Sequence, residues 1–234
     1  NLELCNLDIQ KKSTSININK MQTSNFKLIT IAEIKTKYPF LTEDEKFDYF
    51  EDWENEDFFL IADEDVNFDG NFYLDLYEEK EKKWLANLLN LPPKKIEEIR
   101  IEGIFIDGNF SVGGSIINAE GDYGPYVFIN GNVNCQSLLL GGANVEIKGK
   151  ITAKEAVMTY YNHGSFNCTG LIEAPVFIVT DHNTTFAERK NDLFYYNDRD
   201  EIDLKNECEY DDETGDEIMS NELRKLLDNP LIET

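Results

Sequence analysis

The 234-residue sequence is poor in histidine, cysteine and basic residues. It has two histidines and four cysteines, and 46 Asp and Glu outnumber 22 Lys and Arg, which gives a formal net charge of −24. Proteins that bind the phosphate backbone of nucleic acid need clustered Lys and Arg, so the composition excludes nucleic-acid binding as the main function. The G-x-S-x-G, H-E-x-x-H and P-loop motifs are also missing, and we predict neither an enzymatic activity nor a cofactor.

The sequence contains no run of eighteen apolar residues, so we expect no membrane-spanning helix and no membrane partner. Its four cysteines include no C-x-x-C pair. Cys135 and Cys168 occupy positions at which we expect burial, where a thiol packs like a small apolar side chain. Free thiols are typical of a reducing compartment, and the simplest such compartment is the cytoplasm.

Four glycines, Gly108, Gly131, Gly149 and Gly170, share one local pattern. Counting from each glycine, positions −4, −2, +2 and +4 are apolar or small. These sixteen positions are Ile104, Ile106, Phe110, Val112, Val127, Ile129, Val133, Cys135, Val145, Ile147, Ile151, Ala153, Phe166, Cys168, Ile172 and Ala174. Alternation with a period of two marks strands that bury one face, and repeats of about 21 residues must stack on one another to bury that face.

The repeats therefore predict a mainly β fold, a single-stranded β-solenoid (β-helix) of about four to five rungs, with flanking segments as caps. A sandwich of β-hairpins is the alternative for short, evenly spaced strands. A second apolar run follows each glycine, and a loop of turn-forming residues closes each repeat. The loops cover residues 120–125, 141–144, 162–165 and 181–184. We assign each glycine to a corner at which no side chain can point into the turn.

The N-terminal flank carries a fifth match to the pattern, centred on Gly70, which predicts either another rung or an ordinary strand of a separate N-terminal unit. A helix is expected after it, over residues 80–90. This helix is our candidate cap for the open end of the solenoid, since an unpaired terminal rung invites association between edges. A capping box at Thr42 predicts another helix, and Ser220 predicts a helix near the C-terminus. We divide the chain into an acidic α/β region (1–98), the solenoid (99–187) and an acidic tail with a terminal helix (188–234).

The repeated unit of alternating apolar residues around a glycine resembles the bactofilin, or polymer-forming cytoskeletal, type of bacterial β-solenoid over residues 100–187. That resemblance implies a compact solenoid that polymerises end to end and has no active site. The irregular repeat lengths and the acidic flanks differ from that family. In overall character the acidic chain is similar to immunity proteins of bacterial toxin systems, which implies binding to a basic toxin through a carboxylate-rich surface.

Most of the negative charge lies in the flanks, with a net charge of −15 over residues 42–79 and −10 over residues 188–234. Such a surface favours a basic protein partner, for example a nuclease-type toxin, and a monomer or small oligomer. The expected contact residues are Glu51, Asp52, Glu54, Glu56, Asp57, Asp63, Glu64 and Asp65. The alternatives are a self-associating scaffold and a carbohydrate-active β-helix enzyme.

Both histidines fall in closing loops that are 19 residues apart, close to one repeat. Stacking of the repeats would bring these loops onto one ridge. The ridge residues are Asp122, Tyr123, Asn162, His163, Asp181 and His182. They are consistent with turn formation, with ligand binding or with acid–base chemistry. We expect no stoichiometric zinc, because two histidines and scattered oxygens fall short of a closed tetrahedral site.

Overall fold

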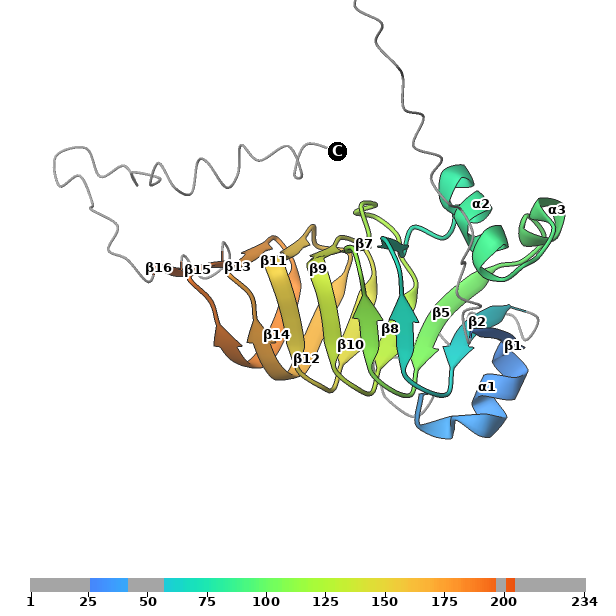
Figure 1. Ribbon diagram of the computed structural model, residues 1–234, viewed down its shortest axis with the longest axis horizontal. Coiled ribbons are helices and arrows are strands. Elements are labelled where there is room, and N and C mark those ends of the chain that lie inside the picture. Colours follow the sequence, from blue (N-terminus) through green and yellow to red (C-terminus); the bar gives the residue numbers. More distant parts are fainter. Residues whose placement is uncertain (1–25, 42–56, 197–200, 205–234) are drawn as a thin grey trace, which may run out of the picture.

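The computed structural model describes residues 26–41, 57–196 and 201–204, and the last of these ranges by its backbone alone. It is a mainly β structure, a solenoid of about five turns in which the successive coils pair in parallel. The coils follow one another along the long axis of the molecule, and the N-terminal elements lie at one end (Figure 1). The predicted solenoid is thus confirmed, and the sandwich of hairpins is not formed.

The strand pairings define three faces. The first face contains β2 (Phe58–Ala62), β5 (Ile101–Ile106), β8 (Tyr126–Ile129), β10 (Asn144–Ile147) and the starts of β12 (Ser165–Glu173) and β14 (Asn183–Lys190). The second face contains β3 (Val66–Phe68), β6 (Phe110–Val112), the starts of β9 (Val133–Leu140) and β11 (Ile151–Tyr160), and the ends of β12 and β14. The third face contains β4 (Phe72–Tyr73), β7 (Ile116–Ile117), the ends of β9 and β11, β13 (Val176–Thr180) and β15 (Leu193–Tyr196), to which β16 (Glu201–Leu204) pairs antiparallel.

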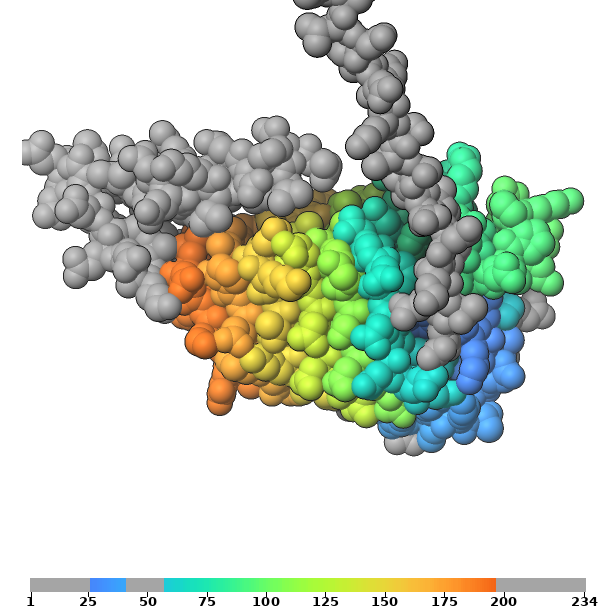
Figure 2. Space-filling model, viewed as in Figure 1, coloured from blue at the N-terminus to red at the C-terminus, as the bar shows by residue number. Residues whose placement is uncertain are grey.

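The sixteen alternating positions all point into the space between the faces. Their exposed fractions run from 0% to 5%, and Val112 has the largest value. They belong to one continuous apolar core that extends from the first coil to the last. In the space-filling view the coils form adjoining bands of successive colour along the molecule (Figure 2). The predicted inward register is confirmed at every one of these positions.

The corner between the first and second faces, which we call the glycine corner, is formed by the four repeat glycines. A Cβ atom on Gly131, Gly149 or Gly170 would lie 2.3–2.4 Å from the carbonyl oxygen of the preceding glycine in the stack. None of these glycines has a positive φ. The glycine is therefore required because the backbones of neighbouring coils touch at this corner, and not because a side chain would enter the turn.

The first coil has a register different from the one the sequence suggested. Val66 pairs with Phe110 and Phe68 with Val112, so that Gly70 lies beside Gly114 and not beside Gly108. The position that corresponds to Gly108 is occupied by Glu64, since Ala62 pairs with Ile106 on the other side of the corner. Among the residues that the structure describes no coil precedes the first one, so none of their backbone oxygens excludes a side chain there. The match centred on Gly70 was wrong in register, although its residues do belong to the solenoid.

The free edge of the first coil is covered by N-terminal elements. Strand β1 (Lys27–Thr30) pairs antiparallel with β2, and α1 (Ile31–Lys37) follows it and leads to the short 3₁₀ turn η1 (Pro39–Leu41). Ile31 and Ile34 are buried against Phe59 and Phe105 on the outer side of the first face. These contacts leave β2 with a partner on both sides and remove it as a site for edge pairing.

The predicted capping helix is α2 (Glu79–Leu88), which is followed by α3 (Pro93–Ile96). The Trp84 ring makes edge-on contacts with Phe68 and Phe72 of the first coil, at centroid distances of 5.9 and 5.1 Å. The pairings extend the solenoid from Phe58 to Tyr196, beyond the expected 99–187. The helices predicted to begin at Thr42 and Ser220 lie outside the described residues. No helix within the described ranges has the length and apolarity needed to span a bilayer.

Candidate functional site

The third corner, between the third and first faces, is made of loops of unequal length, and we call it the loop corner. Its loops are residues 118–125, 141–143, 161–164 and 181–182, each of which connects a strand of the third face to the first face of the next coil. All six residues of the predicted ridge lie on this corner. The loop corner has an inner layer that is buried and an outer layer that is exposed, and the two layers differ in chemistry.

The inner layer begins with a buried amide–carboxylate contact between coils. Asn118 is fully buried and donates from Nδ2 to Asp75 Oδ1 at 2.6 Å, while its Oδ1 accepts the Ala143 backbone N–H at 2.7 Å. Asp75 also accepts the backbone N–H groups of Ala119 and Glu120. These bonds satisfy the backbone donors of the loops, which buried turns otherwise leave unpaired. This layer holds the coils together.

His182 belongs to the inner layer. Its side chain is 2% exposed, with Nε2 3.2 Å from the Gly141 carbonyl oxygen and Nδ1 2.9 Å from Thr184 Oγ1. Because a carbonyl only accepts, Nε2 carries the proton and Nδ1 accepts from Thr184, whose Oγ1 lies 2.9 Å from Thr159 Oγ1. Burial lowers the pKa of His182, which keeps the imidazole neutral. With both nitrogens engaged, His182 has none left for a metal ion or a substrate.

His163 belongs to the outer layer, where it meets the other exposed ridge residues. Its Nδ1 lies 3.1 Å from Asp122 Oδ1, and its ring makes an edge-on contact with Tyr161 at 5.1 Å between centroids. Hydrogen bonding to the Asp122 carboxylate raises the pKa of Tyr161. Tyr123 is 71% exposed and Tyr161 43%, so two aromatic rings face solvent on this corner.

Two non-glycine residues of the outer layer adopt unusual backbone conformations. Tyr161 has φ +73° and Asp181 has φ +46°, in the left-handed region that favours glycine. Tyr161 packs over Gly121, where a Cβ atom would lie 2.9 Å from the tyrosine ring. Tyr161 was not among the predicted ridge residues. The signal that could have identified it is its place directly before the turn-forming Asn162-His163-Gly164.

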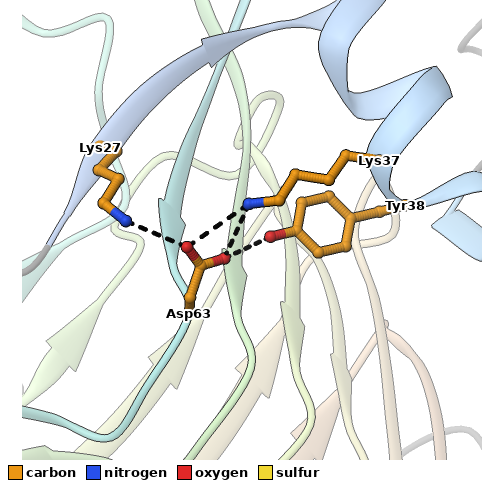
Figure 3. A network of polar contacts seen from close by, with 4 residues as sticks. All are labelled: Lys27, Lys37, Tyr38 and Asp63. Atoms are coloured by element: carbon orange, nitrogen blue, oxygen red, sulfur yellow. Dashed lines mark hydrogen bonds and ion pairs between the residues drawn. The ribbon is translucent and has the colours of Figure 1, made fainter.

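The acidic residues predicted to contact a partner are placed differently. Asp63, which follows β2, is surrounded by Lys27, Lys37 and Tyr38 from the N-terminal elements (Figure 3). The Tyr38 hydroxyl donates to Asp63 Oδ1, and Lys27 Nζ lies 3.1 Å from Oδ2. The hydrogen bond from Tyr38, with those from the two lysines, lowers the pKa of Asp63 to about 2. Asp63 thus attaches β1 and α1 to the first coil.

Two more of these acids also have partners within the protein. Asp57 is 7% exposed. Burial disfavours the charge of Arg100, but the carboxylates of Glu102 and Asp57 attract it, and the pKa of Arg100 is raised. Asp65 Oδ1 accepts the Asn109 backbone N–H at 2.7 Å, which lowers the pKa of Asp65. Glu64 is exposed. The other four predicted contact residues, Glu51, Asp52, Glu54 and Glu56, lie outside the described residues.

Neither a group of metal ligands nor a reactive thiol is found in the described ranges. Within residues 26–41, 57–196 and 201–204, no three His, Cys, Asp or Glu side chains are grouped so that they could hold a metal ion. Cys135 and Cys168 are free and buried, and burial raises the pKa of Cys135 to about 12 and that of Cys168 to about 11. Their thiols remain protonated near neutral pH, so they are not nucleophiles.

The fold and the two layers of the loop corner define the class of this protein, a capped β-solenoid with an exposed aromatic and acidic surface on one corner. No family model, no curated protein and no solved structure matches the chain.

Proposed function

We propose that this protein is a non-catalytic binding protein that recognises a basic protein partner, as an immunity protein or antitoxin recognises its toxin. The observation that carries this proposal is the exposed layer of the loop corner, where Tyr123 and Tyr161 lie among the carboxylates of Asp122 and Asp181. Exposed tyrosines supply much of the binding energy in protein interfaces. Carboxylates beside them favour lysine and arginine on the partner.

The charge distribution supports a basic partner. The segment 42–79 carries a net charge of −15, and a charge of that density attracts a cationic protein over a distance of about 10 Å at moderate salt. In this proposal the acidic segment accelerates the encounter, and the loop corner makes the lasting contacts. The covering of the first coil by β1 and α2 supports a binding protein over a filament-forming scaffold, since end-to-end growth needs both ends of the solenoid bare.

The test starts with the partner itself. The protein is used to purify partners from its source cells, and the recovered basic protein is then measured against two variants by real-time binding. Reversal of Glu51, Asp52, Glu54 and Glu56 to lysine is expected to slow association at least tenfold at low salt, with a smaller effect on dissociation. The double variant Asp122→Asn, Tyr123→Ala is expected to speed dissociation, because it removes desolvated contacts.

Matched controls distinguish these effects from a general loss of charge or of aromatic surface. Reversal of Asp211, Asp212, Glu213 and Glu217 changes the charge by the same amount elsewhere in the chain. Phe40→Ala removes an aromatic ring that is 51% exposed and that belongs to the N-terminal elements. The proposal is wrong if no basic protein is recovered, or if each variant binds with the rates of its control. If the recovered partner is a toxin, added protein is expected to inhibit it in stoichiometric amounts.

A further inference from the structure

A groove on the second face lies away from the loop corner and has a different character. It is a hollow of about 290 Å³ that crosses the first four coils. Its lining residues are Asn67, Phe68, Asp69, Ser111, Val112, Gly113, Asn134, Cys135, Thr152 and Lys154. The hollow follows the long axis of the solenoid, so a ligand in it would touch one set of side chains per coil.

The floor of the groove is a ladder of uncharged polar side chains. Asn67 pairs in register with Ser111, Ser111 with Asn134, and Asn134 with Thr152. Neighbouring members are therefore about 4.8 Å apart, the spacing of paired strands. Each member presents a hydroxyl or an amide, and each of these groups both donates and accepts hydrogen bonds. The ladder thus repeats the same chemistry at a constant interval.

The groove ladder is not used to hold the protein together. In the described part of the chain, the side chains of Asn67 and Thr152 make no hydrogen bond, and the contact between Ser111 and Asn134 is 3.5 Å long. At the nearby glycine corner, by contrast, Asn109 Oδ1 accepts the Asn132 backbone N–H at 2.9 Å. Asn109 and Asn132 belong to the same coils as Ser111 and Asn134 and lie two positions before them in the sequence. Polar groups of the groove are therefore left available to a ligand.

One acidic and one basic side chain lie at opposite ends of the groove. Asp69 of the first coil and Lys154 of the fourth line it, and within the described ranges neither forms an ion pair. One acid and one base on an uncharged floor attract neither a polyanion nor a polycation. Phe68 is half-buried at the first coil, and because it alternates with Asn67 along β3 its ring points inward against Phe72 and Trp84, which leaves the groove floor to the polar side chains. Uncharged groups that both donate and accept hydrogen bonds are suited to a ligand rich in hydroxyl groups.

We propose that this groove binds a linear, neutral oligosaccharide along the solenoid axis, with one sugar unit over each coil. The distance between coils is close to the length of one pyranose unit. Hydroxyl groups of successive units meet the Asn67, Ser111, Asn134 and Thr152 side chains in turn. This binding involves no bond cleavage and is independent of the proposed protein partner, because the groove and the loop corner lie on different sides of the coils.

The experiment uses the full chain and a panel of linear neutral tetrasaccharides with glucose, mannose or N-acetylglucosamine units, in titration calorimetry. At least one member is expected to bind, and its affinity is expected to rise from disaccharide to tetrasaccharide and then level off. Asn134→Ala and Thr152→Ala are each expected to weaken binding at least fivefold while thermal unfolding stays unchanged. The control is Asn130→Ala, which removes an exposed asparagine side chain that contacts Asp107 outside the groove.

Three results would overturn the proposal. The first is no binding by any tetrasaccharide at millimolar concentration. The second is binding that Asn134→Ala and Asn130→Ala weaken equally. The third is preferential binding of a sulfated oligosaccharide or an extended peptide, since either ligand would mean that charge or backbone pairing governs the groove.

Discussion

The glycine corner and the loop corner are two edges of the same coils, yet they vary in different ways from coil to coil. At the glycine corner a single glycine recurs from coil to coil, because the backbones touch and a Cβ atom on Gly131, Gly149 or Gly170 would meet the carbonyl oxygen of the preceding glycine. At the loop corner the connections differ in length, and only their inner layer is held by shared hydrogen bonds. Where neighbouring backbones touch, at the glycine corner, only glycine fits. At the loop corner the outer side chains are not needed for stacking and can have other roles.

The largest expected effect is at the glycine corner. In the Gly149→Ala variant the new methyl group would lie 2.4 Å from the Gly131 carbonyl oxygen, and backbone atoms cannot move aside cheaply. We expect a loss of about 3 kcal/mol in the free energy of unfolding, at the upper end for overpacking. The measurement is chemical denaturation. Gly113→Ala is the control, since its Cβ would have no neighbour closer than 3.4 Å, and equal losses in both variants would contradict the stacking argument.

The next effect separates the two histidines of the loop corner. His182→Leu removes the donor to the Gly141 carbonyl and the acceptor of the Thr184 hydroxyl, which keeps only its contact with Thr159, and we expect a loss of about 1–3 kcal/mol in the free energy of unfolding. His163→Leu removes an exposed ring that contacts Asp122, and we expect its stability to remain within about 0.5 kcal/mol of wild type.

Burial of His182 should also make the stability of the protein depend on pH. Burial lowers the pKa of His182 in the folded state, whereas the unfolded chain takes up this proton near pH 6.5. The wild-type protein should therefore lose stability as the pH falls below about 6.5, and His182→Leu should lack this part of the loss. The difference in stability is measured by thermal unfolding of both proteins between about pH 5 and 8. Identical pH profiles for the wild type and His182→Leu would contradict the assignment of His182 as a buried neutral group.

The smallest effect concerns the attachment of the N-terminal elements. Asp63 has a folded-state pKa of about 2, below its ordinary value, so its stabilising contribution is complete above about pH 4 and is lost as the pH falls toward 2. Asp63→Asn should remove that part of the acid dependence, and the effect should be small because the carboxylate is 37% exposed. The difference is measured by unfolding the wild type and Asp63→Asn between about pH 2 and 5. Asp69→Asn is the control, and a matching change in that variant would rule out the Asp63 network as the cause.

The sequence alone determined the solenoid and its inward residues, because alternation and recurring glycines are local patterns that stacking then enforces. It also predicted α2 and the loop corner as the place of the ridge. The sequence also contains a capping box that we did not predict. Thr30 and Glu33 form it at the start of α1, whereas the predicted box is the one at Thr42. The predicted register of the first coil was wrong, since Glu64 occupies the place of the glycine, where no earlier coil of the described residues makes contact.

Only the tertiary structure decided which loop residues face inward. His163 and His182 look equivalent in the sequence, but Thr184 pairs with Phe166, and this places His182 beside Gly164 and not beside His163. The last coil lacks the repeat glycine and shifts its register against β12, so its inward positions could not be read from the pattern. Likewise, Asp63 looked like one acid among many until β1 and α1 brought two lysines and a tyrosine to it. Local patterns fix the direction of side chains within a strand, whereas contacts between distant segments fix which charged groups are neutralised.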